Sequence, residues 1–151
     1  MNDLVRSALT AGAFTLFLFV LFVVSYWAFR GFLPGSRVVE QALVAPSSLD
    51  ENSAKLRLFY VDWCPYSKDA LKKVRDLEEL LKTLSYGGKR VAIDYVNCEV
   101  NKDECALYKV DGYPTYKLEI STKMYEYIGP ASLESYRAFL VKALGKEVST
   151  E

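Results

Sequence analysis

Trp63-Cys64-Pro65-Tyr66-Ser67 is the stretch that decides the fold, because a strand-like run ends just before it and a helix-like run follows it. Residues 56–61 are almost continuously apolar, and residues 68–84 repeat apolar side chains at helical spacing. A cysteine on the first turn of a helix meets free backbone N–H groups and the positive end of the helix dipole. We therefore predict that Cys64 has a lowered pKa and is nucleophilic near neutral pH.

Ser67 stands three residues after Cys64 and completes a Cys-x-x-Ser pattern. For an isolated cysteine, a small buried thiol that happens to precede a helix would be the simpler interpretation. The flanking Trp63, Pro65 and Tyr66 favour a reactive site instead, and a proline suits the first helical turn, where a missing N–H costs nothing.

Composition excludes several classes of function. The 151-residue chain has 19 basic and 19 acidic residues, so its formal net charge is zero, and no basic stripe supports nucleic-acid binding. Histidine, the commonest metal ligand, is absent, and Cys64, Cys98 and Cys105 lack the paired spacing of a zinc site. We expect no metal and no cofactor. An odd cysteine count fits one disulfide plus one free thiol, which indicates an oxidising compartment.

Residues 8–30 are predicted to form one transmembrane helix. No charged residue occurs between 8 and 29, and a helix of this length crosses a hydrocarbon core of about 30 Å. Arg6 and Arg30 flank the run, Tyr26 and Trp27 form an aromatic belt near its end, and no small-x-small cleavage site follows. The expected organisation is a tail at 1–7, an uncleaved anchor at 8–30, a linker at 31–52, a folded domain at 53–145 and a tail at 146–151.

The remaining pattern predicts an α/β domain. Residues 38–44 of the linker form either a short strand or one or two helical turns; if they dock they supply the first strand, and otherwise they are a tether. The helix after Cys64 is expected to stop at Gly87-Gly88. Further strands are expected at 91–96, 116–120 and 124–128, and further helices at 103–108 and from Ser132 to Gly145. This order gives a mixed sheet with helices on both faces.

Four motifs, in this order and spacing, resemble the catalytic domains of protein disulfide isomerases, which have the thioredoxin fold. They are Phe59-Tyr60-Val61-Asp62-Trp63-Cys64, Asn97-Cys98 with Cys105, Val110-Asp111-Gly112-Tyr113-Pro114-Thr115, and Tyr127-Ile128-Gly129-Pro130. The resemblance extends from about Leu56 to Leu144 and implies a thioredoxin-fold domain that acts on protein thiols and disulfides.

The resemblance also implies roles for individual residues. Cys64 and Ser67 are the expected catalytic pair, and substrate contacts are expected from Trp63, Pro65, Tyr66, Tyr113 and Pro114. Pro114 is expected to be cis, which would bring the Tyr113 backbone beside Cys64 to pair with an extended substrate. Cys98 and Cys105 match an accessory pair that forms a disulfide; two reduced thiols are the alternative. A disulfide would place the domain in the endoplasmic reticulum lumen or an equivalent space, although the flanking arginines lean slightly towards a cytoplasmic domain.

The chain departs from the isomerase pattern in a consistent way. Ser67 replaces the second cysteine, which releases trapped substrates in two-cysteine relatives. Leu58 replaces the buried carboxylate that shuttles the proton of that cysteine, and Ala131 replaces an arginine that tunes it. The intervening histidine is replaced by Tyr66. The resolving half of the reaction is therefore missing together with its helpers.

Three interpretations follow. In the first, Cys64 works alone and forms mixed disulfides with client proteins that last until another thiol attacks. In the second, catalysis is lost and the chain is a membrane-anchored structural component of a large assembly such as a virus particle, so the membrane would be that of the virion. A third, an iron–sulfur glutaredoxin with one active-site cysteine, is weaker because Trp63 and the Cys98/Cys105 pair resemble the isomerase branch.

Overall fold

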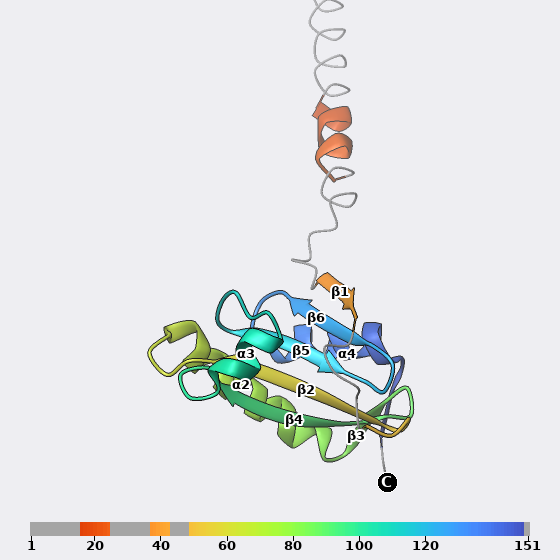
Figure 1. The fold of residues 1–151 in the computed structure, drawn as a ribbon. Helices are drawn as coiled ribbons and strands as arrows, with labels where there is room; N and C mark the ends of the chain where they lie inside the picture. The colour runs from red at the N-terminus through yellow and green to blue at the C-terminus, as the bar shows by residue number, and fades with distance from the viewer. Residues whose placement is uncertain (1–15, 25–36, 43–48, 150–151) are drawn as a thin grey trace, which may run out of the picture. The chain divides into compact units, whose positions relative to one another are not determined.

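The computed structural model describes residues 16–24, 37–42 and 49–149. The chain divides into two compact units, Met1–Gly35 and Ser36–Glu151. In the first unit, residues 16–24 are helical (Figure 1). Within the described residues, no helix is both long enough and apolar enough to span a membrane. Most of the span predicted at residues 8–30 lies outside the described residues.

The second unit is built on a five-stranded mixed sheet in the order β1-β6-β5-β2-β4 (Figure 1). The central strand β2 runs parallel to β4 and antiparallel to β5, and β6 pairs antiparallel with both β5 and β1. The strands are β1 (Arg37–Gln41), β2 (Ser53–Tyr60), β4 (Arg90–Asn97), β5 (Thr115–Glu119) and β6 (Met124–Ile128). The strands expected after the cysteine motif are therefore found within one or two residues of their predicted ends.

Helices cover both faces of this sheet, which confirms the predicted α/β architecture. They are α2 (Pro65–Leu81), α3 (Lys102–Leu107) and α4 (Leu133–Leu144). Because side chains alternate along a strand, Leu58 of β2 packs into the core shared with α2 and α4, while Phe59 packs with α3 on the other face. Both side chains are fully buried, and each such burial contributes about 1.5–3 kcal/mol to folding.

Strand β1 resolves the alternatives left open for residues 38–44 in favour of a docked strand. It pairs with β6 in a register that sets Arg37 opposite Ile128 and Gln41 opposite Met124. The Gln41 side chain also donates a hydrogen bond of 2.5 Å to Glu126 of β6. The segment read as a linker at 31–52 thus supplies an edge strand of the same compact unit.

The helix after Cys64 ends earlier than its apolar period predicts. Its last residue is Leu81, and Lys82 N–H and Thr83 N–H bond to carbonyls three residues back, which tightens the final turn. Leu84, expected on the helix, instead begins strand β3 (Leu84–Tyr86), which pairs with β7 (Glu147–Ser149). This small sheet was not predicted, and it extends regular structure into the segment read as a C-terminal tail at 146–151.

Gly87 follows β3 and has a positive φ of 57°. A Cβ at this position would lie 1.9 Å from the Leu144 carbonyl oxygen, at the C-terminus of α4. The glycine expected to end the helix therefore permits a close approach between the turn after β3 and α4.

A partly buried cation, Arg57, holds α3 against the sheet. The Arg57 side chain, only 14% exposed, lies on the α3 face of β2. Its guanidinium contacts three carboxylates, at 2.8 Å (Asp94), 2.7 Å (Glu104) and 3.3 Å (Glu119). The Tyr108 ring stacks at 5.0 Å and its hydroxyl donates to Glu119 at 3.1 Å. Since Glu104 belongs to α3, the network ties this helix to β2, β4 and β5.

If β1 belongs to the domain, a fragment of residues 36–151 should be more stable than one of residues 47–151. Removing β1 deletes the hydrogen bonds of Gln41 with Lys117 and Glu126, and hydrogen bonds to charged groups contribute about 1.5–3 kcal/mol. Urea unfolding followed by circular dichroism measures the difference. As a control, Glu40→Gln in the longer fragment removes a surface ion pair with Lys123 and should change stability by no more than about 0.5 kcal/mol. Equal stability of the two fragments would show that β1 does not contribute.

Candidate thiol site

Cys64 is the N-cap residue of α2, just after the C-terminal end of β2. Its backbone is extended (φ −82°, ψ 121°), Pro65 occupies the first helical turn, and the Cys64 carbonyl accepts the N–H of Lys68 at 3.2 Å. No side chain caps the helix. The free N–H groups of this first turn are thus available to the Cys64 sulfur, as the sequence predicted.

These N–H groups change the acidity of the thiol. The backbone N–H of Ser67 lowers the pKa of Cys64, partial burial opposes this effect, and the Ser67 hydroxyl and the Tyr66 N–H lower the pKa further. The net shift is downward from the ordinary cysteine value. The residue is only 7% exposed, so its sulfur presents a small surface to solvent.

Ser67 is fully buried beneath the cysteine. Its hydroxyl oxygen accepts the Val61 N–H at 3.4 Å, while its hydroxyl group bonds to the Cys64 sulfur. The side chain therefore connects the end of β2 to the thiol. A hydroxyl can stabilise a thiolate in this position but cannot displace a disulfide.

The Tyr113–Pro114 peptide bond is cis, as expected from the sequence. The Cys64 thiol donates a hydrogen bond to the Tyr113 carbonyl oxygen, with a sulfur–oxygen distance of 3.7 Å. Trp63 and Tyr66 are 68% and 77% exposed beside this contact. The fold thus brings together Cys64, Ser67 and the Tyr113–Pro114 turn, from segments far apart in sequence.

Cys98 and Cys105 form a disulfide between the end of β4 and helix α3. All three cysteines lie within the described residues, and Cys64 is the free one. The disulfide is buried on the α3 face with Phe59 and Tyr108, whereas Leu58 is buried on the opposite face. Leu58 and the half-buried Ala131 place apolar side chains where two-cysteine relatives are expected to have charged ones.

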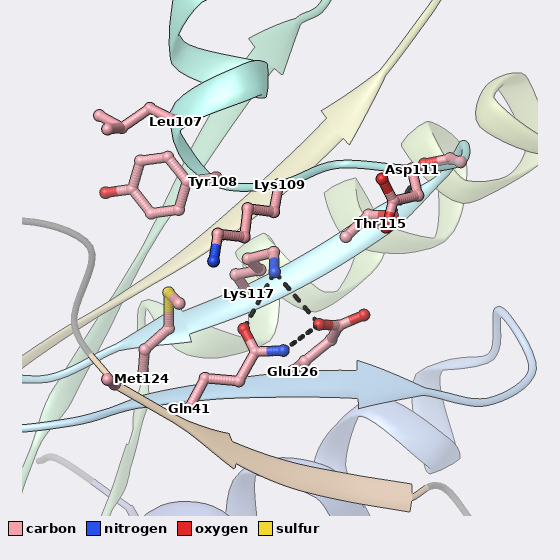
Figure 2. A pocket seen from close by; sticks show the side chains of 11 residues that line it. Gln41, Leu107, Tyr108, Lys109, Asp111, Thr115, Lys117, Met124 and Glu126 are labelled. Atoms are coloured by element: carbon pink, nitrogen blue, oxygen red, sulfur yellow. Dashed lines mark hydrogen bonds and ion pairs between the residues drawn. The ribbon is translucent and has the colours of Figure 1, made fainter.

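Two cavities flank the start of β5. A cleft of about 610 Å³ lies beside the active-site turn, and Tyr66, Asp69, Tyr113, Pro114 and Ala131 are among its lining residues. A second cavity of about 800 Å³ opens on the α3 face of the sheet and contains Lys109 and the buried Lys117 (Figure 2). The Lys117 amine donates to Gln41 at 3.0 Å and to Glu126 at 3.1 Å. Glu126 lines both cavities.

Neither Asp69 nor the hydrogen-bonded group of Lys117, Gln41 and Glu126 was identified from the sequence as part of a site. Asp69 reads as one more charged residue of an amphipathic helix, and only the geometry places it in the cleft. Lys117 sits between Tyr116 and Leu118 in a strand, so alternation does signal that it faces away from their core. Within the described part of the chain, no group of three histidine, cysteine, aspartate or glutamate residues is placed to hold a metal ion.

A family model described as Thioredoxin matches residues 45–142, which include the cysteine motif, the disulfide and the cis-proline turn. The chain belongs to the thioredoxin family. Membership implies thiol–disulfide chemistry in general.

Two of the similar curated proteins are named as protein disulfide isomerases. Protein disulfide-isomerase 1 of Dictyostelium discoideum is 34% identical over 85 residues, which cover 54% of this chain and 23% of that protein. Probable protein disulfide-isomerase A4 of Caenorhabditis elegans is 30% identical over 82 residues, covering 54% of this chain and 13% of that protein. The matched segment therefore corresponds to less than a quarter of each of these two relatives.

The first thioredoxin domain of mouse Protein disulfide-isomerase A4 has a similar structure. It superposes with a TM-score of 0.52 at 22% identity, covering 62% of this chain and 64% of that domain. At this identity the match establishes the thioredoxin fold alone.

Removing the Ser67 hydroxyl should raise the pKa of Cys64. Ser67→Ala deletes one donor to the sulfur but keeps the backbone N–H of residue 67, which is the largest cause of the shift, so the pKa should rise yet stay below the ordinary cysteine value. The pH dependence of Cys64 alkylation by iodoacetamide measures both values. An unchanged midpoint would show that the hydroxyl does not stabilise the thiolate.

Opening the disulfide should destabilise the domain. Cys105→Ser should lower the free energy of unfolding by about 2–4 kcal/mol, because the bridge restricts the unfolded chain. Cys98→Ser should cost the same, and the double variant should cost no more than either. Labelling of all three cysteines in protein prepared without reductant would contradict the bridge and remove the argument for an oxidising compartment.

Proposed function

We propose that the protein acts by thiol–disulfide exchange through Cys64 alone, holding or isomerising client proteins without net oxidation of a dithiol. The observation that carries this proposal is the Cys64–Ser67 contact. The sulfur keeps the donors that stabilise a thiolate, while a buried hydroxyl stands where a second sulfur would resolve the adduct.

The proposed reaction is balanced without any further oxidant. The Cys64 thiolate attacks one sulfur of a client disulfide, one sulfur–sulfur bond forms as another breaks, and the second client sulfur leaves as a thiolate. The Tyr113 carbonyl, 3.7 Å from the attacking sulfur, marks where the client backbone would lie. Ser67 cannot attack the mixed disulfide, so release depends on a client thiol or an external thiol.

We place this activity on a single-pass membrane anchor, with the domain in the endoplasmic reticulum lumen or an equivalent oxidising space. The uncharged run at residues 8–29 supports the anchor, and the Cys98–Cys105 disulfide supports an oxidising space. The isomerase names of the similar proteins are consistent with this location. Partners would be the membrane and client proteins, with no nucleic acid.

A second candidate function is that of a non-catalytic, membrane-anchored structural component of a large assembly such as a virus particle. The low exposure of Cys64, 7%, favours this candidate, because a covered thiol reacts slowly with protein disulfides. The prominent Trp63 and Tyr66 would then serve as protein contacts rather than as substrate contacts.

The two candidates differ in the adducts that they predict. Acid-quenched, non-reducing electrophoresis of the full chain with client proteins should show long-lived mixed disulfides that Cys64→Ser abolishes. Ser67→Cys should shorten their lifetime by about tenfold or more, because an intramolecular thiol acts at a roughly millimolar effective concentration or above. If Cys64 alkylates no faster than a model thiol and no reductant-sensitive adducts appear, the structural candidate is correct.

A further inference from the structure

The cleft beside Cys64 combines acidic and aromatic side chains. Asp69 and Tyr66 line it from the first turns of α2, and Tyr113 lines it from the loop before β5. Among the described residues that line this cleft, none is a lysine or an arginine. Because the whole chain has a formal net charge of zero, this imbalance belongs to the cleft and not to the protein surface in general.

The two acids of the cleft differ in how their charges are compensated. One carboxylate oxygen of Glu126 accepts hydrogen bonds from the buried Lys117 amine at 3.1 Å and from Gln41 at 2.5 Å (Figure 2). Asp69 is exposed and, among the described residues, makes no ion pair. Asp69 is therefore the acid of the cleft that has no ion-pair partner within the described part of the chain.

Two tyrosines that line the cleft, Tyr116 and Tyr127, have raised pKa values, so they add no charge of their own near neutral pH. Burial raises the pKa of Tyr116 to about 12, and among the smaller causes the Asp69 carboxylate acts in the same direction. The Asp69 carboxylate thus acts on the buried Tyr116, which also lines the cleft. Nearer the mouth, the 77% exposed ring of Tyr66 offers a π-face to a cation, an interaction worth about 0.5–1 kcal/mol at exposed sites.

We propose that Asp69 selects clients that carry a lysine or an arginine next to the cysteine that Cys64 attacks. The inference rests on the proposed function, since it specifies the clients of that reaction. A cleft of about 610 Å³ accommodates a long basic side chain, with its charged end at Asp69 and its stem along Tyr66 and Tyr113. Attraction between Asp69 and the basic side chain of the client speeds the attack of Cys64 on the client disulfide. The bonds that form and break are the same as in the exchange reaction proposed above.

Peptide disulfides with a common leaving group test this selection on the full chain. Three peptides are compared, identical except for arginine, its neutral isostere citrulline, or glutamate beside a cysteine that is protected as a pyridyl disulfide. Attack by the Cys64 thiolate joins it to the peptide sulfur and releases pyridinethione, which is followed by absorbance. We expect the arginine peptide to react about threefold faster than the citrulline peptide, and the glutamate peptide to be slowest, as for an exposed ion pair.

Two variants separate a local effect from a general one. Asp69→Asn should bring the arginine-to-citrulline ratio close to one, whereas Asp76→Asn, which removes the same charge about 10 Å further along α2, should preserve it. High salt should also compress the ratio. Equal rates for the three peptides, well above that of a model thiol, would overturn the selection and leave the exchange reaction standing. Rates no faster than a model thiol for every peptide would overturn both.

Discussion

The antiparallel pairing of β2 with β5 is the constraint on which the site depends. Because Phe59 lies opposite Thr115, the C-terminal end of β2 and the start of β5 lie side by side at the same end of the strands. Cys64 follows β2, and the cis Tyr113–Pro114 bond precedes β5. The Cys64 sulfur therefore lies 3.7 Å from the Tyr113 carbonyl oxygen. The parallel register of β2 with β4, which pairs Tyr60 with Asn97, brings Cys98 and its disulfide to the same end.

Within that frame, Ser67 separates two properties that a second cysteine would combine. Its backbone N–H and hydroxyl both stabilise a negative sulfur at Cys64, so the cause of a lowered pKa is retained. Its hydroxyl also accepts the Val61 N–H, which leaves this buried oxygen satisfied. Leu58, fully buried in the core beneath the sheet, fits a site with no second thiol to deprotonate. Stabilisation of the thiolate and resolution of an adduct are thus structurally independent here.

The sequence predicted what local patterns encode and missed what depends on distant partners. The thiol at a helix start, the main helices and strands, and the cap at Ser132, whose hydroxyl accepts the Ser135 N–H, follow from contiguous residues. The pairing of β3 with β7 was not predicted because strands of three residues carry almost no periodic signal. Leu84 continues the apolar spacing of the preceding helix, and only its pairing with β7 shows that it belongs to a strand. In the sequence, Arg57 is the one charged residue in the apolar run at 56–61. Its three carboxylates come from β4, α3 and β5, so only the assembled fold explains its burial.

The edge strand β1 has an electrostatic consequence at the cleft, although it lies outside the cysteine motif. Glu126 lines both cavities; the Lys117 amine compensates its charge, and the Gln41 amide of β1 donates a hydrogen bond to the same oxygen. Lys117 is buried with its amine bonded to the same two residues, so none of the three can change without leaving a buried charge poorly paired. Docking of β1 therefore places a hydrogen-bond donor and acceptor, Gln41, against the Glu126–Lys117 ion pair, whereas Asp69 has no ion-pair partner among the described residues. Under the proposed selection of basic clients, this arrangement leaves Asp69 as the acid available to the client, because Glu126 is already paired with Lys117.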